Sequence, residues 1–406
     1  MSLPIILDAT GVPPSSARFA ALASALQPHA ILILTRRGLE AVPPDVASDA
    51  PVQDGDAAFM AIRAWLLASG PLGADVASTR SSPRSGWAAR GRSRLAALAT
   101  RPLASVDLPP DGILLKIGLS GWDDPALASW LAGHPGIWPV CLATRIWQLD
   151  FPEYEAAETI ATLPASVQAM TRLARRLVVP TDIAGARLSS ALGAASPPLT
   201  VLPTPSRLAG SATTGVDPAL AGTPYLLAVD RLEARGNILM LLGIWRDLVR
   251  SGAAVPKLVL AGRRGAQIQE LKPMLDWNET NRPFVREAPG LTADGLRTLT
   301  LGARAILSPS FAPGSAAFER DALGMGVPVL AADGPMFRGS LGTRAVLLDP
   351  IDGPAWRDAI LKAAMTVSRP PPDRNEPTSW ADYASQLRAM LGSSAIEPIR
   401  NRSLDL

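Results

Sequence analysis

The 406 residues exceed what one hydrophobic core usually supports, and 48% apolar residues are enough to fill two, so two domains of roughly 200 residues are expected. The single cysteine, Cys141, excludes an intramolecular disulfide, and two histidines, His29 and His134, offer no zinc-ligand spacing, so neither metal nor cofactor is expected. The net charge is only +3, but all except four of the 39 basic residues are arginines, which favour planar, bidentate partners such as phosphate.

The first residues reach Asp8 before an apolar core of signal-peptide length can form, so the protein is expected to stay in the cytoplasm. No apolar run approaches the 18 residues that a membrane-spanning helix needs. Extended segments then alternate with helical ones, which is typical of a parallel sheet. The predicted elements are strands at Pro4–Ala9, Ala30–Thr35, Gly112–Ile117, Trp138–Ala143, Leu177–Pro180 and Leu199–Pro203, and helices at Ala17–Leu26, Ala57–Leu67, Asp124–Leu131 and Glu155–Leu173.

A basic segment, residues 79–101, interrupts this alternation. It consists mainly of arginines and small residues, with one tryptophan, Trp87. This composition is typical of a solvated loop. The alternative is a surface patch for anionic lipid head groups or a lipid-linked acceptor, which would place the protein peripherally at the inner membrane face. No aromatic-rich strand or basic helix accompanies the segment, so no nucleic-acid partner is expected.

A stretch rich in Gly, Ala, Ser and Thr, residues 209–223, separates the two halves and predicts a domain boundary. We therefore predict a first domain over 1–208, a second, doubly wound domain over 224–368, and a linker with a terminal helix over 369–406 that returns toward the first domain. The predicted elements are strands at Tyr225–Val229, Lys257–Ala261, Pro283–Arg286, Ala305–Leu307, Val327–Ala331 and Ala345–Leu348, and helices at Ile238–Arg250, Ala266–Leu275, Ala293–Gly302, Ser310–Met325, Pro354–Met365 and Trp380–Leu391.

Two of these helices begin with a residue that favours capping. Asn237 is expected to accept hydrogen bonds from the first-turn amides of the helix that follows it. Ser379 is expected to cap the terminal helix.

Ligands of doubly wound sheets bind beyond the carboxyl ends of the strands, so the loops after strands are candidate sites. Residues 230–237, DRLEARGN, place Arg231 and Arg235 beside a helix N-terminus. Guanidinium groups and free helix amides both favour a diphosphate there. The alternative is a surface loop whose arginines pair with Asp230 and Glu233.

A second candidate loop follows the strand at 305–307 and reads SPSFAPGS. Gly314 and Ser315 would offer backbone and hydroxyl donors at the start of the next helix. Glu319 and Asp321, further along that helix, would hold sugar or ribose hydroxyls. The alternative is that both acids are solvated charges near a helix N-terminus.

Together these motifs resemble glycosyltransferase family 4, in which a G-R-L-x-x-x-K-G or E-P-R-K-N stretch grips the donor diphosphate. The resemblance implies the GT-B fold, an α/β architecture of two doubly wound, Rossmann-like domains that face a central cleft. It covers most of the chain from about Trp138 onward, and it also places Gly11 in the donor site. The segments that carry it are DRLEARGN at 230–237, PSFAPG at 309–314, GVPV at 326–329, DGPMFR at 333–338, LDFPEY at 149–154 and DATG at 8–11.

The chain also departs from the family pattern at matched positions. Pro313 and Asp321 stand at the places of two glutamates, Gly236 at that of the diphosphate-binding lysine, and Gly339 at that of a last glutamate. Thr144 and Arg145 stand where the family has a His-Asp pair, so the catalytic residues stay unassigned.

The resemblance implies a hexosyltransferase that moves a sugar from a nucleoside diphosphate sugar to a glycan or lipid-linked acceptor in polysaccharide biosynthesis, with retention of configuration. No metal is needed where arginines and a helix N-terminus stabilise the departing diphosphate. The alternative is a catalytically inactive, glycosyltransferase-like protein that acts as a regulatory or assembly partner. A nicotinamide-dependent oxidoreductase would need G-x-G-x-x-G after a first strand, which neither half contains.

Overall fold

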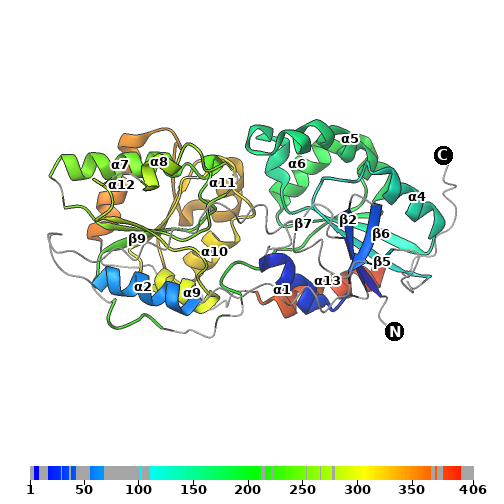
Figure 1. Cartoon of the computed structure of the whole chain (residues 1–406), viewed down its shortest axis with the longest axis horizontal. Coiled ribbons are helices and arrows are strands. Elements are labelled where there is room, and N and C mark those ends of the chain that lie inside the picture. Colours follow the sequence, from blue (N-terminus) through cyan, green and yellow to red (C-terminus); the bar gives the residue numbers. More distant parts are fainter. Residues whose placement is uncertain are drawn as a thin grey trace.

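A computed structural model describes residues 4–8, 17–28, 30–35, 38–42, 55–67, 101–102, 110–209, 211, 215–220, 223–252, 254–265, 267–276, 279–366, 371–372 and 378–394. Two twisted sheets, each with helices on both faces, form two lobes that lie side by side (Figure 1). The predicted fold class, an α/β chain of two doubly wound, Rossmann-like domains, is confirmed. No helix in these ranges is both long and apolar enough to cross a membrane.

The first sheet has the strand order β4-β3-β2-β1-β5-β6-β7-β8. Its strands are β1 (Ile5–Asp8), β2 (Ala30–Thr35), β3 (Gly38–Val42), β4 (Arg101–Pro102), β5 (Gly112–Ile117), β6 (Ile137–Leu142), β7 (Arg176–Val179) and β8 (Leu199–Val201). All pairs from β2 to β8 are parallel, but β3 runs antiparallel to β2 and β4 antiparallel to β3. Only residues 36–37 separate β2 from β3, which suffices for an antiparallel hairpin but not for a parallel crossover.

Helices cover both faces of the first sheet. One face carries α4 (Pro125–Gly133), α5 (Ala157–Leu173) and α6 (Asp182–Leu192), and the other carries α1 (Ala17–Leu26) and the terminal α13 (Trp380–Ser394). Tyr383 and Leu387 of α13 are fully buried against β1 and β5, and α13 lies beside α1 (Figure 1). The Ser379 hydroxyl accepts from the Asp382 amide at 3.0 Å, as its capping role predicts.

The sequence pattern did not predict α6. Its N-cap is Thr181, whose hydroxyl oxygen accepts from the Ala184 amide at 3.1 Å. Gly185 and two serines dilute its apolar periodicity, which hides the helix from a pattern search. A Cβ at Gly185 would lie 3.0 Å from the Leu199 side chain of β8, so glycine lets α6 pack closely on this strand.

The second sheet is wholly parallel, with the order β11-β10-β9-β12-β13-β14. Its strands are β9 (Tyr225–Ala228), β10 (Lys257–Leu260), β11 (Val285–Glu287), β12 (Ala305–Ser308), β13 (Val329–Ala332) and β14 (Val346–Leu348). The helices α7 (Ile238–Arg250), α8 (Lys272–Asp276) and α12 (Gly353–Met365) pack on one face; α9 (Ala293–Gly302), α10 (Ala317–Gly324) and α11 (Pro335–Leu341) pack on the other. The helix predicted over 266–275 is the shorter α8, in which Pro273 occupies the first turn, where proline is tolerated.

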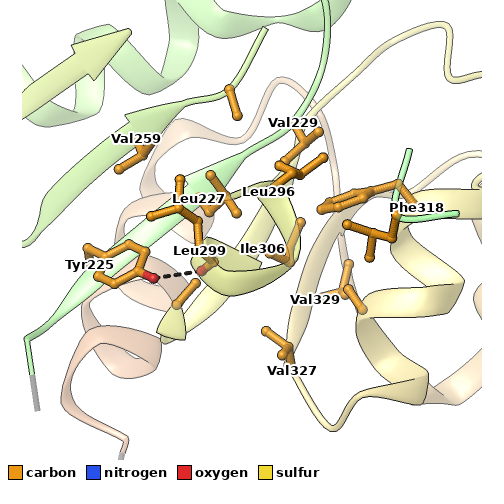
Figure 2. Close-up of a cluster of buried hydrophobic side chains, with 14 of the residues drawn as sticks. Tyr225, Leu227, Val229, Val259, Leu296, Leu299, Ile306, Phe318, Val327 and Val329 are labelled. Carbon is orange, nitrogen blue, oxygen red and sulfur yellow. Dashed lines mark hydrogen bonds between the residues drawn. The ribbon is translucent and has the colours of Figure 1, made fainter. Parts of the chain in front are cut away.

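The strand β9 is buried on both faces, with Leu227 in one core and Leu226 in the other. Leu227 lies opposite Val259 on one side and Ile306 on the other, and all three point into the same core (Figure 2). At the start of β9 the Tyr225 hydroxyl donates to the Leu299 carbonyl oxygen at 2.6 Å, and this bond joins the strand to α9. Continuous apolar strands of this kind are typical of a parallel sheet covered on both faces.

The helix α2 (Gly55–Leu67) lies beside α9 on the second sheet, although it precedes most of the first sheet in the chain (Figure 1). Its residues Ile62, Trp65 and Leu66 belong to the core of Figure 2. The Lys257 ammonium group donates to the carbonyl oxygens of Trp65 and Leu66, at 2.7 and 2.9 Å, and so holds the carboxyl end of α2. The predicted boundary assigned this helix to the first domain, whereas its apolar face completes the second core.

Candidate functional site

The two domains meet where the carboxyl ends of strands from both sheets face each other; we call this region the seam. It encloses a cavity of about 10 Å³. The cavity is lined by Thr144, Ile146, Trp147, Pro180 and Ala184 of the first domain and by Pro313, Gly314 and Met336 of the second. Such a volume holds about one water molecule, whereas pockets for small-molecule ligands measure roughly 300–1,000 Å³. The seam is therefore closed in this conformation.

Aromatic and cationic side chains close the seam. Trp147, on the short 3₁₀ helix η3 (Ile146–Leu149), has the Arg145 guanidinium 5.6 Å and the Arg235 guanidinium 5.4 Å from its ring centroid. Beside it, the rings of Tyr154 and Phe311 stack with centroids 6.4 Å apart and planes 6° apart. Arg235 and Phe311 belong to the second domain, whereas Trp147 and Tyr154 belong to the first. The cation–π contact and the ring stacking therefore bridge the domains.

Arg235 is almost completely buried and fully engaged. Its Nε donates to Glu233 at 2.7 Å, one terminal nitrogen donates to Asp230 at 2.8 Å, and the other to the Ala312 carbonyl oxygen at 2.9 Å. Burial alone would lower the pKa of Arg235, but the charges and hydrogen bonds of Asp230 and Glu233 outweigh burial and raise it. The structure thus shows the pairing of Arg235 with both acids, and its part in holding a diphosphate stays a prediction.

The backbone of Arg235 also ties the two candidate loops together. Its carbonyl oxygen accepts from the Phe311 amide at 2.9 Å and from the Ser310 hydroxyl at 3.1 Å. Because the side chain binds Ala312 as well, residues 230–237 and 308–316 form one rigid unit. The two predicted donor loops are therefore neighbours in space.

Asn237 does not cap α7, and this prediction is wrong. Its side chain makes no capping hydrogen bond, and its backbone is left-handed, with φ of 53°. The side-chain nitrogen Nδ2 donates instead to the carbonyl oxygens of Pro309 and Pro350, at 3.2 and 2.7 Å. Buried carbonyl groups need donors, and Asn237 supplies one to each of these two loops.

Arg145 and Arg231 complete a group of three arginines at the seam. Arg145 donates to Glu155 and keeps 41% of its side chain exposed. Burial lowers the pKa of Arg145, Glu155 raises it, and the positive charges of Arg235 and Arg231 lower it further, so Arg145 lies within electrostatic range of both other arginines. Arg231 is exposed, and within the described part of the chain its side chain has no ion-pair or hydrogen-bond partner.

The residues predicted from the second loop and the helix after it all follow β12. Gly314 is exposed at the seam, and the Ser315 hydroxyl is 3.1 Å from that of Thr204, which follows β8. Glu319 accepts from the Ser308 hydroxyl at 2.8 Å. Burial raises the pKa of Asp321 against the lowering effects of Ser206 and Arg320, and its Oδ2 atom is buried without a hydrogen-bond partner.

Some sequence predictions fall outside the described residues. Gly11 does, and so does the basic segment 79–101 apart from Arg101, which lies in β4. Among the described residues, no three acids, histidines or cysteines converge in a way that could hold a metal ion.

One departure from the family pattern has a packing reason. A Cβ at Gly339 on α11 would overlap the end of the Ile183 side chain on α6, so glycine lets these helices of different domains touch. Neither this contact nor the place of Trp147 in the seam could be predicted from local sequence, because both depend on how the domains meet.

No protein-family model matches the chain, and no curated protein matches it. Solved structures do. Sucrose-phosphate synthase from Thermosynechococcus elongatus is 14% identical, with a TM-score of 0.57 over 96% of this chain and 94% of that one. HepE from Anabaena in complex with UDP and glucose is 14% identical, with a TM-score of 0.56 over 96% and 95%.

A third structure, TarM, is 12% identical with a TM-score of 0.48 over 72% of this chain, and the chain spans about half of its length, 53%. The near-complete overlap with the first two structures shows the fold: the chain is a two-domain protein of the GT-B type. At these identities the likeness defines the architecture alone.

Proposed function

We propose that the chain is a glycosyltransferase that binds a nucleoside diphosphate sugar at the seam and transfers the sugar to a glycan or lipid-linked acceptor. One observation carries this proposal: Arg145, Arg231 and Arg235 converge where the carboxyl edges of two Rossmann-like sheets face each other. A cluster of guanidinium groups at that place suits a diphosphate. The structural neighbour HepE, solved with UDP and glucose, has the same fold.

In this function the arginines stabilise the charge of the departing diphosphate, which is the largest charge that develops in the transfer. Gly314 lines the seam cavity, and the buried Oδ2 of Asp321, which has no hydrogen-bond partner, has the capacity to accept from a sugar or ribose hydroxyl. Retention of configuration, independence of metal, and family 4 membership are further parts of the proposal, and they rest on the sequence resemblance. A cytoplasmic location and a peripheral membrane contact through 79–101 are also part of the proposal, and they rest on the composition of the sequence.

A second candidate function is a catalytically inactive partner that keeps the fold. The closed seam favours it, because the cavity there is far smaller than a nucleotide sugar and Arg235 already has protein partners on all three nitrogens. Pro313, at the place of a family glutamate, has no side-chain acceptor for a sugar hydroxyl. In this case binding could outlast catalysis, since small misplacements of reacting atoms cost about a hundredfold in rate.

Two measurements separate the candidates. Titration calorimetry with UDP, GDP, ADP, CDP and dTDP tests whether any nucleotide binds. Incubation with the corresponding sugar nucleotides and a lipid-linked acceptor extract then follows release of diphosphate and the mass of the product. Binding with turnover supports the enzyme, binding without turnover supports the inactive partner, and absence of binding for all five nucleotides contradicts the transferase function.

A further inference from the structure

The seam contains a cation that the sequence motifs did not assign to the donor. Arg145 comes from the first domain, directly after β6, and shares the Trp147 ring with Arg235 of the second domain. The two guanidinium groups lie 5.6 and 5.4 Å from the same ring centroid, so both contact one indole. Arg145 is thus held in position opposite the loop 230–237.

The engagement of each arginine decides which one has donors left for a ligand. Arg235 uses all three of its nitrogens on protein groups. Arg145 spends one terminal nitrogen on Glu155 and keeps 41% of its side chain exposed, and a guanidinium carries five N–H donors. Arg231 is exposed, and no described residue pairs with its side chain. The cations with capacity to spare are therefore Arg145 and Arg231.

The second domain also lacks a cation that its loop would be expected to provide. At Gly236 there is no side chain, and a Cβ there would lie 3.2 Å from the Arg231 carbonyl oxygen. A dianionic ligand bound by Arg231 alone would keep most of its charge uncompensated in a partly closed site. Arg145 of the facing domain can supply a second cation.

We infer that Arg145 binds the diphosphate of the donor from the first-domain side, opposite Arg231, so that the anion bridges the seam. The inference rests on the proposed function, because it names a residue of the same site. Arg145 and Arg231 are like charges that repel each other, and an anion between them turns this repulsion into attraction. Trp147 positions Arg145 for this task, and Arg235 positions the loop that carries Arg231.

The test uses inorganic pyrophosphate and the five nucleoside diphosphates as probes, titrated into the full chain. We expect Arg145→Gln to weaken binding of every probe roughly ten- to a hundredfold, the loss typical of a hydrogen bond to a charged group. Arg172→Gln is the matched control, because Arg172 is an exposed arginine in the last turn of α5 on the same domain, outside the seam cavity. It should leave all affinities unchanged.

A second variant is expected to raise the affinity, which a merely structural role of Arg145 would not explain. Glu155→Gln removes the acid that competes for Arg145 and should tighten binding of pyrophosphate several-fold. If the wild type binds a probe but neither variant changes its affinity, the role of Arg145 is refuted and the proposed function stands. If the wild type binds none of the probes, the proposed function fails as well.

Discussion

Arg235 links more groups than any other side chain at the seam, and its loss has two expected effects. Arg235→Ala leaves Asp230 and Glu233 without their partner and frees the loop at Ala312, so the free energy of unfolding should fall by about 2–4 kcal/mol. Affinity for a nucleoside diphosphate should fall by about 1.5–3 kcal/mol if the predicted donor contact also exists. Urea denaturation and calorimetry measure the two effects separately.

The exposed Arg250, at the end of α7, provides the control for Arg235. Arg250→Ala should change the free energy of unfolding by no more than about 0.5 kcal/mol. Equal stability of the Arg235 and Arg250 variants would show that the ion pairs at the loop contribute nothing. Reduced stability with unchanged affinity would restrict Arg235 to positioning the loop.

Asp321 should make stability depend on pH. Burial raises its pKa in the folded protein above the ordinary 3.8, so the folded state binds the proton more tightly than the unfolded chain. The cost of ionising the group is absent below 3.8 and grows as the pH rises through the raised pKa, so stability is lost in that direction. Asp321→Asn removes this titration.

The expected observation is therefore a difference between Asp321→Asn and wild type that shifts in favour of the variant as the pH rises from 3.8. Above the raised pKa the difference should become constant. Urea denaturation at a series of pH values measures it. A difference that stays the same at every pH would mean that Asp321 is not disfavoured as an anion in the folded state.

Two helices pack on the domain that is remote from them in sequence: α2 completes the core of the second domain, and α13 completes a core of the first. Single truncations should reveal which domain each helix stabilises. Ile62 of α2 lies in the second core, so Ile62→Ala should cost about 2–4 kcal/mol there. Leu387 of α13 lies in the first core, and Leu387→Ala should cost a similar amount in that domain.

Cys141 reports on opening of the first domain alone, because it is the only cysteine and lies in β6 of that domain. Burial raises the pKa of its thiol to about 12, so alkylation at neutral pH requires the first domain to open. Leu387→Ala should accelerate alkylation, whereas Ile62→Ala should lower the thermal midpoint without accelerating it. Equal acceleration by both variants would mean that the two domains unfold as one unit.

Helices with a strong apolar periodicity were predictable from sequence. The distant segments that an element packs against were not. The helices Ile238–Arg250 and Ala293–Gly302 have the predicted bounds because their apolar residues recur at helical spacing. The placement of α2 on the second sheet depends on Lys257 and on contacts between segments almost 200 residues apart, which a local pattern does not contain. Asn237 failed as a cap for the same reason: its partners, Pro309 and Pro350, are remote in sequence.

The candidate site was predictable only in part as well. Residue types and their place after strands indicated the loops 230–237 and 308–315, which the structure joins through Arg235. Sequence could not show that Arg145 and Trp147 of the other domain close over them, because that arrangement depends on how the domains meet. Whether these residues hold a donor stays a prediction for the binding experiments.

At the scale of the whole molecule, the closed seam implies that a donor can enter only after the domains separate. The cavity of about 10 Å³ is too small for a nucleotide sugar, so binding at the seam requires the domains to move apart. Apparent affinity and association rate are then reduced by the fraction of molecules that are open. A substitution that favours the open form should raise both.

Gly339 is the place to make that substitution, because its missing side chain lets α11 touch Ile183 on α6. Gly339→Trp should hold the two helices apart, increase the radius of gyration in small-angle scattering, and raise the association rate of a fluorescent nucleoside diphosphate by about tenfold. Gly334→Trp is the control, since a Cβ at Gly334 meets no atom within 4 Å. A larger radius of gyration without faster association would show that the seam does not limit entry, and an unchanged radius would show that α6 and α11 do not hold the domains closed.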